Sequence, residues 1–386
     1  MIDCKNTNIF LNRLAFFKRK YSQAKIIAIT GSYGKTSAKS VLGNVLSKYG
    51  NTFYSKKSYN NHYGVPISLS NLECDHEYGI FEVGMSKAGE INKLSKLIQP
   101  KIAVITNIGE AHIENFKNTK SIANAKAEII NNIKKGGYLI INRDDKFFKY
   151  INNLAKKKKV NVLSFGFSRK SEIKIIKTSH FKKYKLLDIK IYKEKIRIKI
   201  KNNSTINIYN ILICLAVLNI LKLNTKIAQN CFYNLDSTEG RGKINRIKRF
   251  KKFFNLIDES YNANPSSVKN AIYNFSRIKK NKQKKYLLLG DMMELGKKTD
   301  FYHKKLSTFI NNSDIDKLFI IGDNALKTYQ SIYKIKRGNI LQNMQDFDEV
   351  FSNVIKKNDY LMIKGSNATG LNNLSKNLIL GNQNAL

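Results

Sequence analysis

The chain has 386 residues, with 69 Lys and Arg against 28 Asp and Glu, which gives a formal net charge of +41. This length exceeds one ordinary hydrophobic core, and the apolar content of 42% supports two or three globular domains. Four cysteines without a CxxC pair exclude a zinc ribbon and a disulfide framework, and they indicate a reducing, cytoplasmic setting. We expect no transmembrane segment, because no apolar run approaches the ~20 residues that span a bilayer. We also expect no signal peptide, because Asn12 and Arg13 interrupt the apolar N-terminus.

The positive charge allows two interpretations, a nucleic-acid footprint and a bias of the coding sequence. The lysines are spread over the whole chain, and Asn and Ile are abundant as well. An AT-rich coding sequence favours all three residue types, so we favour the second interpretation and expect no nucleic-acid partner. In either case the positive field suits an anionic substrate.

Residues 1–24 predict a short N-terminal extension with one helix. Within residues 7–21, apolar side chains such as Phe10, Leu14 and Phe17 precede the basic run Lys18-Arg19-Lys20. A basic amphipathic helix of this kind packs on a neighbouring domain or lies on a membrane surface. We favour packing and retain membrane contact as the alternative.

A phosphate-binding pattern organises the first part of the chain. Apolar residues 26–29 predict a buried strand, and an apolar-periodic run after residue 37 predicts a helix. The loop between them is expected to hold nucleotide phosphates through Gly31, Ser32, Tyr33, Gly34, Lys35, Thr36 and Ser37. Its backbone N–H groups can turn toward an anion, the Lys35 ammonium can reach the outer phosphates, and the Thr36 hydroxyl can ligate Mg²⁺. A plain glycine turn after a core strand is the alternative, and we favour binding of a nucleoside triphosphate.

The remaining pattern predicts a mixed α/β fold in two domains. Residues 25–237 alternate strands and helices, which is typical of a mostly parallel sheet with covered faces. Alternating isoleucines and charges within residues 171–201 predict a small antiparallel appendage with a turn at 192–195. Residues 238–386 predict a smaller, Rossmann-like α/β domain, with strands at 253–258, 285–290, 317–321 and 359–364.

Three charged or polar residues in the first domain are candidates for chemistry. Glu82 lies inside an apolar strand, where a carboxylate is costly unless it is paired or binds a metal. His112 follows the next strand, so both residues are expected at the edge of the sheet where α/β proteins bind ligands. A buried ion pair for Glu82 and a loop histidine for His112 are the alternatives. Lys126, in the predicted helix 121–133, is on its own an ordinary surface lysine.

Eight motifs follow one another in a fixed order along residues 25–380. Thr-Gly-Ser-Tyr-Gly-Lys-Thr is followed by Asn-Asn-x-x-Gly-Val-Pro, Glu-Val-Gly-Met, Thr-Asn-Ile-Gly-x-Ala-His and Ala-Lys-Ala-Glu-Ile. Gly-Arg-Gly, Asp-Glu-Ser-Tyr-Asn-Ala-Asn-Pro and Gly-Asp-Met-Met-Glu-Leu-Gly come after them. This order resembles the Mur ligases, and the last two segments resemble the branch of that family that adds D-alanyl-D-alanine.

The resemblance implies an ATP- and Mg²⁺-dependent ligase of peptidoglycan precursor synthesis. ATP would phosphorylate the carboxylate of a UDP-muramyl-tripeptide, and a D-Ala-D-Ala-like amine would displace the phosphate to form an amide. Phosphoryl transfer needs positioning and charge neutralisation more than a covalent group, and the phosphate-binding pattern suits that need. The family thus implies small-molecule partners for the chain.

The resemblance also implies a role for individual residues. It gives Lys35, Lys126 and His112 catalytic roles, with Lys126 carbamylated. It assigns one Mg²⁺ to Thr36 and a second metal site to Glu82, His112 and Lys126. A carbamylated lysine is an oxygen ligand, which suits Mg²⁺. The remaining implied positions are Asn207 and Asn210 at adenine, Arg241, Asp258 and Glu259 at ATP, and Asn61, Asn262 and Asn264 at the substrates. An N-cap is the alternative for Asn207.

Three departures from the family pattern stand out. Glu259 replaces the second of two usual aspartates, and Asn367 replaces an arginine after Lys364-Gly365-Ser366. Only about 25 residues precede the first strand, where the family carries a domain that holds the uridine diphosphate. We therefore expect a partner chain, a reduced set of substrate contacts or a different acid substrate. The rival interpretations are a Mur-like ligase for another acid, a basic P-loop ATPase that binds nucleic acid, and a non-catalytic scaffold.

Overall fold

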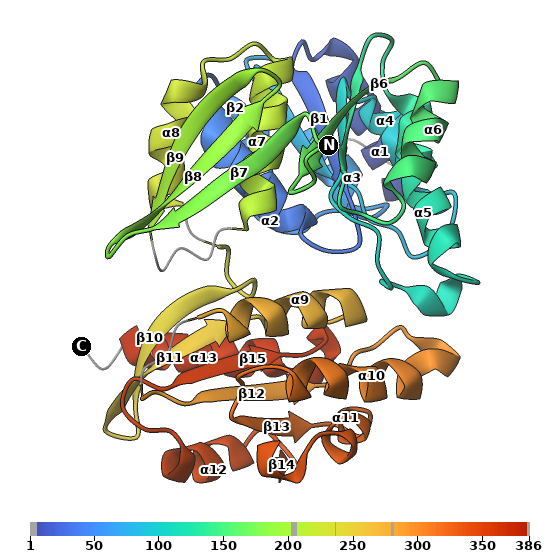
Figure 1. Ribbon diagram of the computed structural model, residues 1–386. Coiled ribbons are helices and arrows are strands. Elements are labelled where there is room, and N and C mark those ends of the chain that lie inside the picture. The colour runs from blue at the N-terminus through green and yellow to red at the C-terminus, as the bar shows by residue number, and fades with distance from the viewer. Residues whose placement is uncertain (1–5, 202–206, 236, 279–281, 384–386) are drawn as a thin grey trace. The chain divides into compact units, whose positions relative to one another are not determined.

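The chain folds into two compact units, each built on its own sheet. The computed structural model describes residues 6–201, 207–235, 237–278 and 282–383 (Figure 1). The first unit comprises residues 1–109 and 116–236, and the second comprises residues 110–115 and 237–386. Both units have helices on both sides of a largely parallel sheet, which confirms the predicted α/β class.

The first unit contains a nine-stranded sheet in the order β2-β3-β1-β4-β5-β6-β7-β8-β9. The strands are β1 (Lys25–Thr30), β2 (Thr52–Tyr54), β3 (Tyr78–Glu82), β4 (Ile102–Ile105), β5 (Tyr138–Asn142), β6 (Asn161–Gly166), β7 (Ile173–His180), β8 (Tyr184–Ile191) and β9 (Glu194–Lys201). Pairing is parallel from β2 to β7 and antiparallel from β7 to β9. The antiparallel appendage is therefore confirmed, and it continues the main sheet through the pairing of Phe165 with Ile173.

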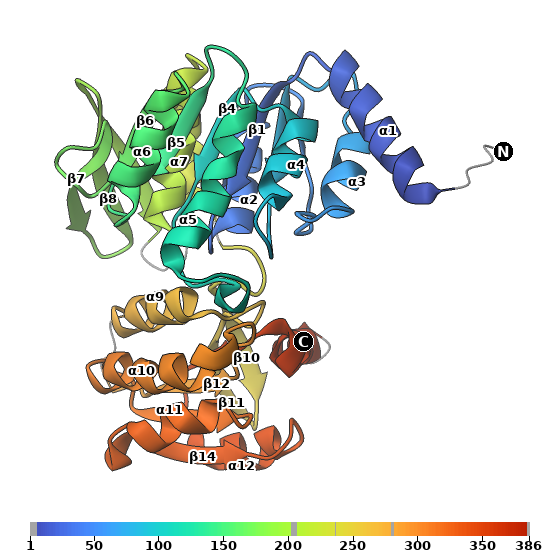
Figure 2. The same cartoon turned by 90° about the vertical axis from the view of Figure 1, so that its right-hand side faces the viewer.

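Helices cover both faces of this sheet. They are α1 (Thr7–Tyr21), α2 (Lys35–Leu46), α3 (Gly64–Ser70), α4 (Glu90–Ile98), α5 (Thr119–Ala127), α6 (Phe148–Lys157), α7 (Ile208–Ile220) and α8 (Thr225–Asn234). Helices α2, α7 and α8 share one apolar core with the strands, while α4, α5 and α6 lie on the opposite face (Figure 2). The turn between β8 and β9 is shorter than predicted, because β9 already begins at Glu194.

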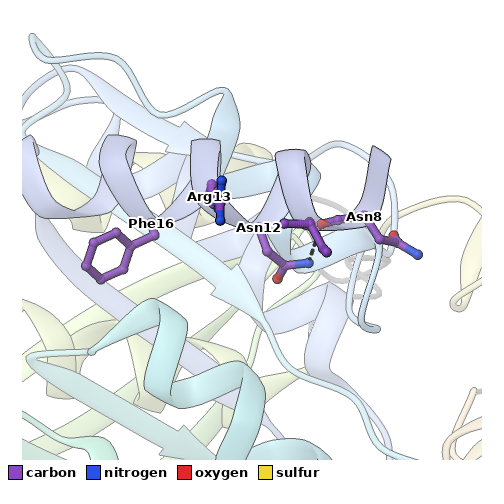
Figure 3. A pocket seen from close by; sticks show the side chains of 5 residues that line it. Asn8, Asn12, Arg13 and Phe16 are labelled. Carbon is purple, nitrogen blue, oxygen red and sulfur yellow. Dashed lines mark hydrogen bonds between the residues drawn. The ribbon is translucent and has the colours of Figure 1, made fainter. Parts of the chain in front are cut away.

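Helix α1 packs on α3 and α4 with one face and leaves the other face open. Ala15 and Arg19 are buried, and the Arg19 guanidinium donates to the carbonyls of Ile98 (2.6 Å) and Gln99 (2.9 Å) at the end of α4. Phe16 and Phe17 are exposed. A shallow hollow on α1 is lined by Asn12, Arg13 and Phe16, among others (Figure 3). In the described residues, no helix combines the length and apolar content that a membrane span requires.

The second unit contains a six-stranded sheet in the order β10-β11-β15-β12-β13-β14. The strands are β10 (Lys243–Arg249), β11 (Lys252–Asp258), β12 (Lys285–Gly290), β13 (Lys317–Ile321), β14 (Arg337–Leu341) and β15 (Tyr360–Lys364). All pairs are parallel except that of β10 with β11 at one edge. The sequence analysis missed β10 and β14, since both are edge strands rich in charged and polar residues.

Helices α9 (Pro265–Ser276), α10 (Thr299–Asn311), α11 (Ala325–Ser331), α12 (Asp346–Val354) and α13 (Leu371–Gln383) complete the second unit. Its core contains Phe254, Phe319 and Leu361 of the sheet, packed against Phe351 of α12 and Leu378 of α13. Helix α10 contacts both α9 and α11. The residues of these three helices do not belong to that core. As in the first unit, the parallel strands end together at one edge, and the polar candidates follow those ends.

Candidate active site

The phosphate-binding loop has the backbone geometry that the sequence predicts. Gly31 has φ +150° and Gly34 has φ +79°, which L side chains rarely adopt. A Cβ at Gly31 would lie 1.9 Å from Thr106 Oγ1, so no other residue fits there. Gly34 caps the N-terminus of α2, which begins at Lys35, and a helix N-terminus directs its N–H groups at an anion.

The end of the neighbouring strand β4 braces this loop. The Thr106 hydroxyl (2.8 Å) and the Asn107 amide (3.0 Å) both donate to the Tyr33 carbonyl. The Tyr33 N–H donates back to Asn107 Oδ1 at 3.1 Å. Ser32 Oγ donates to the carbonyl of Gly109 at 3.0 Å and accepts from its N–H at 2.8 Å. The Thr-Asn-Ile-Gly segment therefore holds the loop in place, a role that its sequence did not reveal.

Glu82 lies at the end of β3 with 2% of its surface exposed, in contact with Thr36. The Thr36 hydroxyl donates to Glu82 Oε2 at 2.8 Å, so two residues that the sequence analysis assigned to separate metal ions are in direct contact. Ser58 Oγ (2.8 Å) and Asn60 Nδ2 (2.7 Å) donate to Glu82 Oε1. These side chains hold the carboxylate in one orientation, as burial of an ionised group requires.

Lys39 completes this carboxylate cluster, which we define as Thr36, Lys39, Ser58, Asn60 and Glu82. Its ammonium lies 3.7 Å from Glu82 Oε2, and both side chains are almost fully buried. The sequence analysis did not single out Lys39 or Ser58. The available signal was helical spacing, because Lys39 follows Lys35 by four residues and Thr36 by three, so all three share one helix face.

Lys126 is buried in α5, which excludes the alternative of an ordinary surface lysine. Burial lowers the pKa of its amine well below the usual value, and the nearby Lys35 ammonium lowers it further. In the described part of the chain, no carboxylate lies within ion-pair distance of Lys126. The Lys35 ammonium donates to the Gly31 carbonyl at 2.8 Å. The two catalytic lysines implied by the motifs thus share one electrostatic environment.

His112 belongs to the short segment that is grouped with the second unit. Its Nδ1 lies 2.7 Å from Glu294 Oε2, and this contact lowers the pKa of the Glu294 carboxyl. Both residues have positive φ, +56° for His112 and +62° for Glu294, which is uncommon outside glycine and concentrates at functional sites. The structure thus brings together Thr36 and Glu82 in the first unit, and it groups His112 with Glu294.

Two acidic candidates lie at the end of β11 in the second unit, Asp258 as its last residue and Glu259 directly after it. Asp258 is buried, and its carboxylate accepts from the Gly240 N–H (2.8 Å) and the Ser260 hydroxyl (2.6 Å). Glu259 Oε2 lies 3.3 Å from the buried Lys364 ammonium, which also donates to the Asn262 carbonyl at 3.0 Å. The two adjacent carboxylates therefore have different environments, one held by neutral donors and one by a lysine.

Four candidate asparagines take part in local turns and caps. Asn207 Oδ1 accepts from the Tyr209 N–H at 2.9 Å and caps α7, so its predicted alternative role is present. Asn264 caps α9 in a reciprocal capping box with Ser267. Asn61 Oδ1 accepts hydrogen bonds from the N–H groups of Tyr63 and Gly64, and Asn262 Oδ1 accepts one from the N–H of Ala263.

Asn210 and Arg241 differ from the capping asparagines. The Asn210 side chain is buried in the first turn of α7. The Arg241 guanidinium lies over the ring of Tyr261, 4.1 Å from its centroid, in a cation–π arrangement. Stacking on an aromatic face limits the conformations of the arginine and leaves its planar edge for other contacts.

His303 shapes the loop that carries Glu294. Its Nε2 accepts from the Met292 N–H at 3.1 Å, and its Nδ1 lies 2.9 Å from the Thr299 carbonyl. Burial lowers the pKa of this imidazole, which agrees with a neutral ring protonated at Nδ1. Through these contacts the His303 ring fixes the backbone of the Gly-Asp-Met-Met-Glu-Leu-Gly segment.

Comparison with known proteins agrees with this geometry. The Mur ligase middle domain matches residues 29–218, and the glutamate ligase domain of Mur ligases matches residues 245–367. A UDP-N-acetylmuramoyl-tripeptide–D-alanyl-D-alanine ligase of Rickettsia prowazekii is 32% identical over 374 residues, which cover 94% of this chain and 80% of the relative. The chain belongs to the Mur ligase family.

Two further comparisons support this membership. The ligase of the same name from Buchnera aphidicola of Acyrthosiphon pisum is 34% identical over 386 residues, covering 97% of this chain and 81% of the relative. The crystal structure of MurF from Acinetobacter baumannii superimposes with a TM-score of 0.86 at 26% identity, covering 98% of this chain and 83% of that one. This Mur ligase chain thus spans about four fifths of the length of these relatives.

Proposed function

We propose that the chain is an ATP-dependent ligase that joins D-alanyl-D-alanine to a UDP-N-acetylmuramoyl-tripeptide. The observation that carries the proposal is the braced phosphate loop with Lys35 and Thr36 beside Glu82, in a chain whose relatives bear the name of this activity. A non-catalytic scaffold would not need these groups together. The relatives also favour the proposal over a nucleic-acid-binding ATPase.

The reaction needs two steps on the acid substrate. Its carboxylate attacks the γ-phosphorus of ATP and releases ADP, and the amine of the dipeptide then attacks the acyl phosphate, which forms the amide and releases phosphate. In the first step, Lys35 and the N–H groups at the start of α2 bind and orient the phosphate oxygens. The bracing contacts of Ser32 and Tyr33 keep these donors in place during transfer.

The carboxylate cluster fits a magnesium ion. Thr36 and Glu82 provide hydroxyl and carboxylate oxygens 2.8 Å apart, and Mg²⁺ prefers oxygen ligands together with substrate phosphates. Bound there, Mg²⁺ would neutralise the charge that the γ-phosphate gains during transfer. Thr36, Glu82, His112 and Lys126 are the residues that we propose to hold the metal ions.

Lys126 suits the carbamylation that the family implies. A neutral amine adds to CO₂, its nitrogen lone pair forms the new C–N bond, and one proton is released as the carbamate forms. Burial favours the neutral amine that this addition needs. The product is an anionic oxygen ligand, and its charge is opposite to that of the adjacent Lys35.

The remaining candidates complete the proposed substrate contacts. We assign Asn207, Asn210, Arg241, Asp258 and Glu259 to the nucleotide, and Asn61, Asn262 and Asn264 to the acid and amine substrates. We place the reaction in the cytoplasm, in agreement with the cysteine usage. A partner chain that binds the UDP group stays a prediction, and the relatives do not favour a different acid substrate.

Phosphate release tests the proposed function directly. The purified chain is incubated with Mg·ATP, UDP-muramyl-tripeptide and D-Ala-D-Ala, and each component is omitted in turn. We expect release only when all three are present, with formation of the amide product in equal amount. If phosphate release needs the dipeptide and a different acid, that acid is the substrate in place of the UDP-muramyl-tripeptide. Phosphate release without either substrate would contradict the ligase assignment.

A further inference from the structure

Lys39 is a buried lysine that no motif of the chain assigns. It lies on α2, one turn beyond Lys35 and Thr36, and none of its surface is exposed. An ammonium in such a place is costly unless charged and polar partners compensate for its lost hydration. Its partners therefore indicate what the side chain does.

The first partner is the Glu82 carboxylate, 3.7 Å away. Both groups are out of water, where a charge pair interacts more strongly than at the surface. Loss of one member would leave the other as an uncompensated buried charge. Lys39 thus places its side-chain nitrogen beside the proposed metal ligand.

The other partners belong to the loop after β2. The Lys39 ammonium donates to Ser55 Oγ at 2.9 Å and to the Lys57 carbonyl at 2.6 Å. The same loop supplies Ser58 and Asn60, which donate to Glu82 Oε1. Lys39 therefore restrains both oxygens of the Glu82 carboxylate. It contacts Oε2 directly, and it holds the loop whose side chains donate to Oε1.

The loop has a third attachment beyond the carboxylate. The Gly84 N–H donates to the Asn60 carbonyl at 2.7 Å, and a Cβ at Gly84 would lie 2.9 Å from the Asn60 side chain. The loop thus connects α2, the end of β3 and the residues just after β3. Within this connection, the Lys39 Nζ atom contacts both the loop backbone, at the Lys57 carbonyl, and the Glu82 carboxylate.

We propose that Lys39 is a positioning residue that fixes Glu82 and loop 55–60 for cation binding. The inference rests on the proposed role of Thr36 and Glu82 in holding a metal ion. Lys39 itself does not contact the reacting atoms. It sets the orientation of the carboxylate, so its loss weakens the cation site more than it weakens the fold.

The test measures Mn²⁺ binding by electron paramagnetic resonance, with the full-length chain and a non-hydrolysable ATP analogue. Lys39→Gln removes the charge, and Lys39→Arg keeps it. We expect Lys39→Gln to weaken Mn²⁺ binding by about 10- to 100-fold, the range for residues that orient metal ligands. Lys39→Arg should recover part of that loss.

A second buried lysine provides a matched control. Lys285 in the second unit is also fully buried, and its ammonium contacts Asp314 Oδ2 (2.7 Å) and the Ser276 carbonyl (2.9 Å). Lys285→Gln should lower the melting temperature and leave Mn²⁺ affinity unchanged. If Lys39→Gln behaves like this control, Lys39 is only a structural residue and the inference is wrong.

Two more variants separate the possible failures. Glu82→Gln should lose Mn²⁺ affinity; if it binds as the wild type does, the proposed metal site itself is wrong. If Glu82→Gln loses affinity and Lys39→Gln keeps it, only the inference on Lys39 fails. Should Lys39→Gln not fold, Ser55→Ala replaces it, since it removes one Lys39 acceptor and keeps both charges. Unchanged affinity in Ser55→Ala would then overturn the inference.

Discussion

The surroundings of Lys39 and Lys126 differ although both lysines are buried in the first unit near the phosphate loop. Lys39 has Glu82 beside it, as Lys285 has Asp314 and Lys364 has Glu259 in the second unit. Among the residues that the structure describes, Lys126 has no such carboxylate, and the nearby charge that affects it is the like charge of Lys35.

We infer from this difference that Lys39 stabilises a neighbouring carboxylate, whereas Lys126 is suited to react as a neutral amine. A buried ammonium with a carboxylate remains ionised and holds its surroundings, as the contacts of Lys39 indicate. A buried amine near another cation has a lowered pKa and becomes nucleophilic, which is a feature of functional sites. The predictions below test whether this separation holds.

The largest effect is expected from Lys35→Ala. The variant removes the cation that we propose to contact the transferred phosphate, and cations in that position contribute on the order of 10³-fold or more to phosphoryl transfer. We expect at least that loss in the rate of amide formation, with an unchanged far-ultraviolet circular dichroism spectrum. Activity near that of the wild type would exclude the proposed role of Lys35 in phosphate binding. Lys35 and Lys126 would then not share a function.

Lys126→Ala should also disable the enzyme, by on the order of 100-fold, the upper range for a lost orienting partner of a metal site. Acetate or formate in millimolar amounts should restore part of the activity, because a small carboxylate can replace the carbamate oxygens. The readout is phosphate release as a function of carboxylate concentration. Full activity without any additive would show that Lys126 needs no modification.

Lys126 should also affect how stability depends on pH. Because its pKa is lower in the folded state than the usual 10.5, the unfolded chain binds more protons between these two values. The free energy of unfolding therefore rises with pH in that window, by up to about 1.4 kcal/mol per pH unit. Lys126→Met should remove this rise in urea unfolding from pH 7 to 10 in CO₂-free buffer. If the free energy of unfolding depends on pH in the same way in the variant and the wild type, the pKa of the Lys126 amine is not lowered in the folded state.

The smallest effect is expected from the cap of α9. Asn264→Ala removes the side-chain acceptor for the Ser267 N–H, which costs about 1 kcal/mol at a typical N-cap. Asn264→Asp keeps the cap and serves as the control in thermal unfolding. If both variants retain their melting temperature, the capping box does not stabilise the second unit. If Asn264→Asp keeps the melting temperature and both variants lose activity, the amide of Asn264 contacts substrate as well.

The sequence predicted most of the buried strands and missed β2, β6, β10 and β14. The predicted strands around Ile26, Val104 and Leu288 are present because their side chains face helices on both sides. Strand β10 was missed because its two apolar residues, Ile244 and Ile247, are three positions apart and give no alternation, while its other residues are charged or polar, as an edge strand allows. Short β2 has only three residues and gives no periodic signal.

The candidate site was predictable as far as its contacts are local in sequence. Glycines and Lys35 form one loop, so their spacing alone indicated phosphate binding. The contact of Lys39 with Glu82 joins residues 43 positions apart, and a single sequence gives no signal for that pairing. The bracing of Tyr33 by Asn107 was hidden for the same reason.

The division of the chain has a consequence for protein dissection. Residues 110–115 are grouped with the second unit although the chain on either side of them belongs to the first. The backbone therefore passes between the units at residues 109/110, 115/116 and 236/237, and a single cut cannot separate them cleanly. A fragment that begins at Ser237 would lack His112, and Glu294 would lose its partner. Recombination between relatives should consequently exchange the 110–115 loop together with the C-terminal half.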